Sequence, residues 1–429
     1  MTTHSLAEPA IFARRESEAR SYCRSFDRVF TRAVGSTLFD RDGRGYIDFL
    51  AGCSSLNYGH NDPDMKEALI AHLAADGIAH GLDMFTDTKQ AFLEAFEKHI
   101  LLPRNLPHRL MMTGPTGTNA VEAALKLARK VTGRQNVVAF TNGFHGMTLG
   151  ALALTGNASK RAGAGGAGLG DVTRMPYAGA FGAGVDTLAQ VEMMLANPSS
   201  GIDAPAAFIL ELVQGEGGLT AASADWVRGL ADLARRHGAL LIVDDIQAGI
   251  GRTGGFFSFD GMGIEPDMIT LAKSLSGFGL PMAALLVRPE HDIWKPAEHN
   301  GTFRGNTHAF VTARVTLEKF WADDAFAATV AEKADLLTGH LARIAAHLPG
   351  ASLRGRGMMQ GIDTGSGVRA AAICAESFRQ GLIIETSGAE DEVVKVLAPL
   401  TTPVAQFEEG LAILEAAVLA TGSQQIAAE

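Results

Sequence analysis

Five short, uninterrupted apolar runs constrain the fold of this chain more than any other feature of its sequence. They span residues 137–140, 207–210, 239–243, 268–271 and 283–287. Their apolar residues are continuous and do not alternate with polar ones, which is typical of strands that helices cover on both faces. Helices are expected between some runs, because apolar residues recur at three- and four-residue spacing over 119–131 and after Ser223. The pattern predicts an α/β fold with a mostly parallel central sheet sandwiched by helices.

The two ends of the chain differ from this central part in their pattern of helical and strand-like residues. Residues 310–429 hold long helical stretches, short strand-like pieces and a final helix from about residue 406, which favours a smaller α+β unit. Strand-like residues also flank a turn near the N-terminus. We predict an N-terminal segment over 1–65 that forms part of the small domain, a large α/β domain over 66–309, and a small α+β domain over 310–429.

Charge and cysteine content argue against several classes of protein. The 429 residues include 37 Lys or Arg and 47 Asp or Glu, a net charge of −10 that disfavours binding to nucleic acid or anionic lipid. No uncharged apolar stretch approaches the roughly 20 residues that span a bilayer, and residues 1–20 lack a signal-peptide core. The three cysteines have neither close pairing nor metal-ligand spacing. We expect a cytoplasmic protein without a metal site and without a nucleic-acid or membrane partner.

One glycine motif is misleading. Gly163, Gly165 and Gly168 satisfy the G-x-G-x-x-G spacing of dinucleotide-binding folds. That motif needs a strand before it and a helix after it, but the polar residues Lys160 and Arg161 precede it and a turn follows. We interpret this stretch as a surface loop and do not expect a nucleotide-binding dehydrogenase.

Two predicted strand ends carry residues suited to catalysis. Asp244 and Asp245 follow one apolar run, and Lys273 follows another. Open α/β sheets bind ligands beyond the carboxyl ends of their strands, and only one of two adjacent carboxylates faces such a site. A buried carboxylate needs a cationic partner, for which a protonated heterocyclic nitrogen would serve. A desolvated lysine has a lowered pKa, as a Schiff-base lysine requires. Taken alone, however, each feature has an alternative in a helix cap or a solvent-exposed lysine.

Two further motifs complete a set. Residues 113–119 are rich in Gly and Thr and precede a predicted helix, where an anion would bind, although an ordinary helix cap has the same residues. The aromatic turn at Phe144 and His145 offers a stacking face. With Asp244 and Lys273, these motifs supply a phosphate pocket, a ring-stacking face, a counter-ion for a pyridinium nitrogen and a reactive amine. The sequence therefore predicts pyridoxal 5′-phosphate as the cofactor.

On these motifs the chain resembles the class III aminotransferases of pyridoxal-phosphate fold type I, from about residue 30 to residue 400. The resemblance implies small amino acids and 2-oxo acids as substrates, and a homodimer or larger homo-oligomer whose subunits share each active site. It also implies that Lys273 holds the cofactor as a Schiff base and moves protons, while Asp244 pairs with the pyridinium nitrogen. The other implied cofactor-binding residues are Gly117, Thr118, Phe144, His145, Gln247 and, from the other subunit, Thr302.

Within this family, the chain is similar to the branch whose members form diaminobutyrate in ectoine biosynthesis. The stretches that carry the similarity are 21–26, 56–61, 80–84, 114–122, 144–148 and 301–306. The similarity implies reversible ping-pong transfer of an amino group from L-glutamate to L-aspartate 4-semialdehyde, giving L-2,4-diaminobutyrate and 2-oxoglutarate. The alternatives are a diaminobutyrate transaminase of siderophore or peptide metabolism, a GABA- or ornithine-type transaminase, and a pyridoxal-phosphate aminomutase.

The chain departs from the broader family at two positions that bind substrate carboxylates. Met147 stands where many members have Arg, and Lys395 stands where glutamate-using members pair an Arg with a Glu. We hypothesise that Arg304 or Lys395 binds the carboxylate, and that Glu216 neutralises Lys395 when an amine-ended substrate is bound. Lysine offers a point charge and not a bidentate fork, so it would hold a carboxylate more loosely. A structural role for Arg304 and Lys395 is the alternative.

Overall fold

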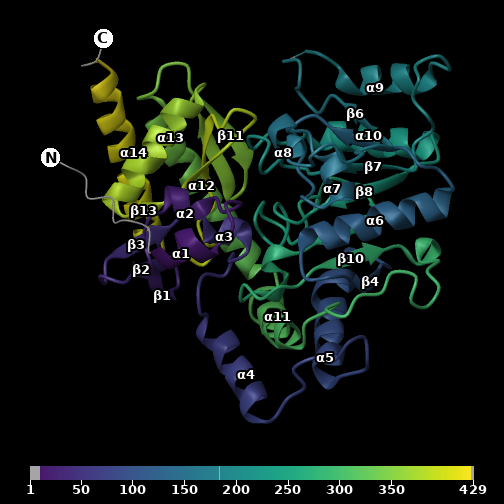
Figure 1. The fold of residues 1–429 in the computed structure, drawn as a ribbon, viewed down its shortest axis with the longest axis horizontal. Coiled ribbons are helices and arrows are strands. Elements are labelled where there is room, and N and C mark those ends of the chain that lie inside the picture. Colours follow the sequence, from purple (N-terminus) through teal and green to yellow (C-terminus); the bar gives the residue numbers. More distant parts are fainter. Residues whose placement is uncertain (1–9, 183, 427–429) are drawn as a thin grey trace.

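A seven-stranded sheet forms the centre of the larger half of the molecule (Figure 1). The structure, a computed structural model, describes residues 10–182 and 184–426. In spatial order the strands are β4 (Arg109–Met112), β10 (Ala284–Val287), β9 (Met268–Leu271), β8 (Leu240–Asp244), β7 (Ala207–Leu210), β5 (Val137–Phe140) and β6 (Val172–Met175). Only β10 runs against its neighbours. All five apolar runs form strands of this sheet, as predicted.

Helices cover both faces of the sheet. Successive side chains of a strand point to opposite faces, so Phe208 lies in one apolar core and Ile209 in the other. The first core is shared with α5 (Asp87–Phe96), α10 (Ala224–Arg236) and α11 (Thr307–Phe320), and the second with α6 (Gly117–Thr132) and α7 (Leu149–Leu154). Burial on both faces is the reason that these strands lack polar alternation.

The smaller half of the molecule joins the two ends of the chain (Figure 1). One sheet consists of β1 (Phe30–Val34), β2 (Thr37–Asp40), β3 (Gly45–Asp48) and β13 (Leu382–Ile383), and β13 pairs in parallel with β3. A second, antiparallel sheet has the order β11 (Ser352–Arg356), β12 (Met359–Asp363), β15 (Val393–Val396) and β14 (Glu385–Ser387). Helices α12 (Ala325–Ala345), α13 (Gly367–Gln380) and α14 (Val404–Ile426) surround these sheets. The predicted fold class is confirmed, whereas the predicted domain boundaries stay a prediction.

Local signals set the ends of the main helices. The Thr116 and Asn119 side chains form a capping box at the start of α6, and Gly133 ends this helix with φ of +70°.

The misleading glycine motif begins directly after α8 (Ala158–Ala162), and turns occupy it, as predicted. The other helices are α1 (Ala10–Arg15), α2 (Tyr22–Ser25), α3 (Ala51–Ser54), α4 (Pro63–Ala74) and α9 (Thr187–Ala196). Within residues 10–182 and 184–426, no helix is long and apolar enough to cross a membrane.

The buried Arg252 ties the two halves of the molecule together. It lies in the loop that follows β8, and its guanidinium donates to the carbonyl oxygens of Met358 (3.2 Å) and Ala398 (2.7 Å) in the smaller half. It also donates to Oδ1 of Asn57 (2.6 Å), in the N-terminal region. Burial lowers the pKa of Arg252 to about 9. These bonds fix the smaller half beside the carboxyl ends of the central strands.

Candidate active site

A cavity of about 400 Å³ opens at the carboxyl ends of β8 and β9, against the first turn of α6. Most of the predicted site residues line it: Gly117, Thr118, Phe144, His145, Glu216, Asp244, Gln247 and Lys273. The three predicted residues outside its lining are Thr302, Arg304 and Lys395. We call the part around Asp244 and Lys273 the cofactor end, and the part around Glu216 the substrate end.

Asp244, the last residue of β8, lies in a prearranged set of hydrogen bonds. Its Oδ2 lies 2.7 Å from Nδ1 of His145, and its Oδ1 accepts from the Thr270 hydroxyl (3.0 Å). Thr270 is also its partner across the β8–β9 pair, so the register of the sheet supplies this bond. Burial alone would lower the pKa of His145, but its hydrogen bond to Asp244 and the charge of that carboxylate raise it. The carboxylate is therefore held in one orientation at the cavity wall.

The neighbouring Asp245 points to the opposite face of the sheet. It is completely buried, and its carboxylate accepts from the backbone N–H of Ser258 (3.0 Å). Burial raises the pKa of Asp245 to about 7. The alternation of strand side chains thus separates two adjacent carboxylates, and only Asp244 lines the cavity.

Lys273 reaches the cavity from the short helical turn that follows β9. Its φ is +50°, a left-handed conformation that costs free energy in a non-glycine residue and that clusters at functional sites. Burial lowers the pKa of the Lys273 amine. A lower pKa leaves more of the amine unprotonated at neutral pH, which makes it a better nucleophile and proton carrier.

Glu211 is a cavity residue that the sequence analysis missed. It directly follows β7, and its two carboxylate oxygens accept from the backbone N–H groups of Phe144 (2.8 Å) and Gly215 (3.0 Å). Burial raises the pKa of Glu211 to about 7. A polar residue at the end of an apolar run is the signal that singled out Asp244, and it could have identified Glu211 as well.

The start of α6 forms the polar corner of the cofactor end. The Thr118 hydroxyl lies 2.6 Å from the Thr148 hydroxyl, and both threonines lie at helix starts. At Gly117 the backbone packs so closely that an added Cβ would lie 2.8 Å from the Ile246 side chain. Backbone N–H groups in the first turn of a helix attract anions. The corner can therefore receive a phosphate group.

Gln247 stands between the two ends of the cavity. Its Nε2 donates to the Cys53 carbonyl oxygen (3.3 Å) and lies 3.4 Å from Oε1 of Glu216. Its Oε1 is buried and accepts no hydrogen bond within the part of the chain that the structure describes. Because Oε1 packs against Gly215, a rotation of the Gln247 side chain would present this acceptor to a hydroxyl group of a molecule in the cavity.

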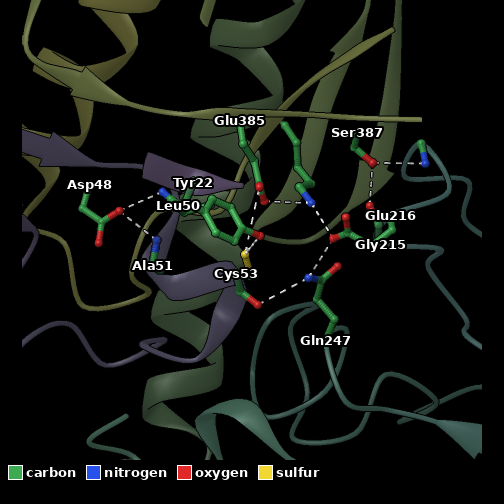
Figure 2. Close-up of polar contacts among 12 residues, drawn as sticks. Tyr22, Asp48, Leu50, Ala51, Cys53, Gly215, Glu216, Gln247, Glu385 and Ser387 are labelled. Atoms are coloured by element: carbon green, nitrogen blue, oxygen red, sulfur yellow. Dashed lines mark hydrogen bonds and ion pairs between the residues drawn. The ribbon is translucent and has the colours of Figure 1, made fainter. Parts of the chain in front are cut away.

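A buried ion-pair cluster stands behind the substrate end (Figure 2). Nζ of Lys395, which is fully buried, lies 3.0 Å from Oε1 of Glu216 and 2.9 Å from Oε1 of Glu385. Lys395 lowers the pKa of Glu216 to about 2. Burial alone would lower the pKa of Lys395, but the two carboxylates raise it. Glu385 was missed in the sequence analysis, because its contact with Lys395 depends on the pairing of β14 with β15.

The remaining predicted residues lie on the loop 299–305. Thr302 is exposed, whereas Arg304 is half-buried and donates to the Met112 carbonyl oxygen from Nε and Nη2 (both 3.3 Å). Neither residue lines the cavity of its own chain.

The cofactor end fits pyridoxal phosphate in its chemistry. The cavity places a desolvated amine on Lys273, a fixed carboxylate on Asp244 and an anion-binding helix start at Thr118 along one wall. These groups complement an aldehyde, a protonated ring nitrogen and a phosphate. The unsatisfied Oε1 of Gln247 can accept from a ring hydroxyl.

The sequence of this chain is similar to sequences of known aminotransferases. The family model for class III aminotransferases matches residues 19–418. A diaminobutyrate–2-oxoglutarate transaminase from Streptomyces anulatus is 53% identical over 412 residues, which are 96% of this chain and 98% of that protein. A transaminase of the same name from Vibrio cholerae is 55% identical over 411 residues, which are 95% of this chain and 99% of that protein.

Solved structures share the fold. An aminotransferase from Bacillus anthracis superposes with a TM-score of 0.85 at 22% identity, covering 95% of this chain and 97% of its own, a likeness of fold alone. An ornithine aminotransferase from Toxoplasma gondii, whose active site holds pyridoxal phosphate at partial occupancy, has a TM-score of 0.81 at 25% identity and covers 97% of this chain and 94% of its own. The chain belongs to the class III aminotransferases, a pyridoxal-phosphate-dependent family, so the predicted family, enzyme class and cofactor are confirmed.

Proposed function

We propose that the chain is a diaminobutyrate–2-oxoglutarate transaminase, which moves an amino group reversibly between L-glutamate and L-aspartate 4-semialdehyde. The products are L-2,4-diaminobutyrate and 2-oxoglutarate. The observation that carries this proposal is identity above 50% over nearly the whole chain to several transaminases of that name. Ectoine biosynthesis is the pathway we propose, and the cytoplasm is the compartment, where the three cysteines would stay free thiols.

The residues at the cofactor end have distinct proposed tasks. Bound pyridoxal phosphate supplies an aldehyde that takes up the amino group and a ring that accepts electron density. Lys273 holds the cofactor and carries a proton to and from the reacting carbon, which its lowered pKa favours. Asp244 holds a proton on the ring nitrogen, and His145 and Thr270 fix its orientation.

The other proposed contacts surround the ring. Phe144 offers a stacking face, and Gln247 binds the ring hydroxyl. Gly117 and Thr118 bind the phosphate at the start of α6.

Glu216 is the proposed contact for the amine end of a substrate, because it alone of the Glu216–Lys395–Glu385 cluster lines the cavity. Lys395 lies behind it and is reached only if Glu216 moves. Arg304 is the proposed contact for a substrate carboxylate, acting from a neighbouring subunit. Its guanidinium offers the bidentate geometry that Lys395 lacks.

We also propose a homodimer in which each subunit completes the other's site through Thr302. Exposed apolar side chains support this arrangement. Leu82, Met84 and Phe303 are 50%, 57% and 66% exposed and surround a cavity of about 330 Å³ beside the loop 299–305. Apolar groups gathered in this way favour association with another chain. Sedimentation equilibrium should give twice the chain mass of 45.1 kDa, and a stable active monomer would contradict the dimer.

Single half-reactions test the substrate assignment. The purified holoenzyme is mixed separately with diaminobutyrate, ornithine, GABA and acetylornithine, and the change in cofactor absorbance is recorded. Diaminobutyrate should react with the highest ratio of rate to apparent dissociation constant. If ornithine bleaches the cofactor absorbance while diaminobutyrate does not, the substrate assignment is wrong, although the family assignment remains.

A further inference from the structure

The substrate end holds one cation between two carboxylates. Lys395 and Glu385 are direct cross-strand partners in the β14–β15 pair, so the register of this hairpin places them on one face. Glu216 approaches Lys395 from the other half of the molecule, on the loop after β7. The cluster therefore carries one positive and two negative charges when all three groups are ionised.

The two oxygens of Glu385 contact different groups. Oε1 forms the ion pair with Lys395, and the Cys53 thiol donates to Oε2 (4.0 Å). Burial raises the pKa of Cys53 to about 11, so this thiol keeps its proton at neutral pH. The Tyr22 hydroxyl lies 2.7 Å from the Cys53 sulfur and extends the chain of contacts (Figure 2). Glu385 is thus fixed against Lys395 and is not a mobile surface carboxylate.

The three side chains of the cluster differ in how much of each is exposed to solvent. The side chain of Glu216 is 35% exposed, that of Glu385 13% exposed, and that of Lys395 fully buried. A bound substrate therefore meets the Glu216 carboxylate and not the lysine. If Glu216 swings away, Glu385 still neutralises Lys395, so a substrate carboxylate gains little from it.

We propose that Glu385 is a positioning residue that keeps Lys395 occupied, so that Glu216 selects the free ammonium group of a diamino acid over a second carboxylate. The choice of a diamino acid rests on the proposed function. A diamino acid bound through one amine presents an ammonium and a carboxylate, whereas glutamate bound through its amine presents two carboxylates. Glutamate would then rely on Arg304 of the neighbouring subunit for its carboxylate.

Binding of glutarate, an unreactive dicarboxylate, tests this role. Isothermal titration calorimetry of the holoenzyme compares wild type with Glu385→Gln, Glu385→Asp and the control Glu376→Gln. Glu376 is a similarly buried glutamate that is ion-paired with Arg379 within α13. Glu385→Gln should bind glutarate about tenfold more tightly, because one opposing charge near Lys395 is removed. Glu385→Asp and Glu376→Gln should bind as wild type does.

A double variant keeps the proposal testable if the single variant Glu385→Gln does not fold. Lys395→Met with Glu385→Gln removes one charge of each sign, so it should keep the glutarate affinity of the wild type. A tenfold loss in the double variant would mean that Lys395 itself binds carboxylates. Unchanged glutarate binding in folded Glu385→Gln would also overturn the proposal.

Steady-state kinetics give a second readout. Glu216→Gln should raise KM for diaminobutyrate about tenfold while changing kcat little, because the lost contact serves binding. An equal KM in this variant and the wild type would contradict the selection by Glu216. If the wild type does not react with diaminobutyrate at all, the proposed function fails, whereas the glutarate result still decides the role of Glu385.

Discussion

The two ends of the cavity are built in different ways. At the cofactor end, Asp244 and Lys273 come from the ends of two adjacent strands, and cross-strand pairing to Thr270 orients the carboxylate. At the substrate end, Glu216 comes from the larger half, whereas Lys395 and Glu385 come from a hairpin of the smaller half. One sheet thus positions the residues proposed for the chemical step, whereas the seam between the two halves of the molecule positions those proposed for the choice of substrate.

Removal of the amine at the cofactor end should have the largest effect. Lys273→Ala should lower the half-reaction rate by at least about 10³-fold, because no other lysine among residues 10–182 and 184–426 lines the cavity. Rapid-scanning absorbance of the half-reaction with diaminobutyrate measures the loss. After borohydride reduction, the wild type should carry cofactor on the peptide that contains Lys273, and the variant should not.

The matched control is Lys126→Ala, at an exposed lysine on α6. This variant should react at the wild-type rate. If the Lys273→Ala enzyme kept the wild-type rate, the contrast between the two ends of the cavity would be wrong, because the cofactor end would then not perform the chemical step.

Removal of the charge on Asp244 should have the next largest effect. Asp244→Asn should slow the half-reaction about 10²-fold, since a neutral amide cannot hold a proton on the ring nitrogen. The absorbance spectrum of the cofactor should change in parallel. A rate within error of the wild type would exclude a role for this carboxylate in the chemistry.

The adjacent Asp245 serves as the control for Asp244. Its substitution should change stability and not the reaction rate. Its pKa is raised to about 7 in the folded protein, against an ordinary value of about 3.9 in the unfolded chain. Between these values the folded state binds a proton that the unfolded state does not, so stability falls as pH rises through this window. Asp245→Asn should flatten the dependence of the melting temperature on pH and leave the half-reaction rate unchanged. Unaltered pH dependence of the melting temperature would contradict this assignment.

Among the variants that should impair the reaction, the smallest effect is expected at the seam between the two halves of the molecule. The Ser387 hydroxyl donates to the Gly215 carbonyl oxygen (2.6 Å) and accepts from the N–H of Gly218 (3.2 Å), which holds the Glu216 loop on β14. Ser387→Ala should cost about 1–2 kcal/mol of stability by denaturant titration. It should raise KM for diaminobutyrate several-fold with kcat nearly unchanged. A fall in kcat alone would show that the seam serves the chemical step and not substrate choice.

Asp244 could be identified from the sequence, whereas Glu385 could not. Asp244 was identified because a polar residue that ends a buried strand stands out against the apolar run before it. Glu211 follows the same rule and was overlooked. Glu385 has no such signal, since its importance comes from facing Lys395 across a hairpin whose register is set by packing.

The sequence by itself determined the central sheet, its helical cover and the placement of Asp244 and Lys273 at strand ends, because these depend on local apolar patterning and on the direction of strand side chains. The pairing of Lys395 with Glu216 was already a hypothesis from the family resemblance, whereas only the tertiary structure decided that Glu385 is a second partner of Lys395 and that Arg304 lies outside the cavity of its own chain. The Lys395–Glu216 contact joins residues 179 positions apart, and no local pattern encodes which distant side chains meet.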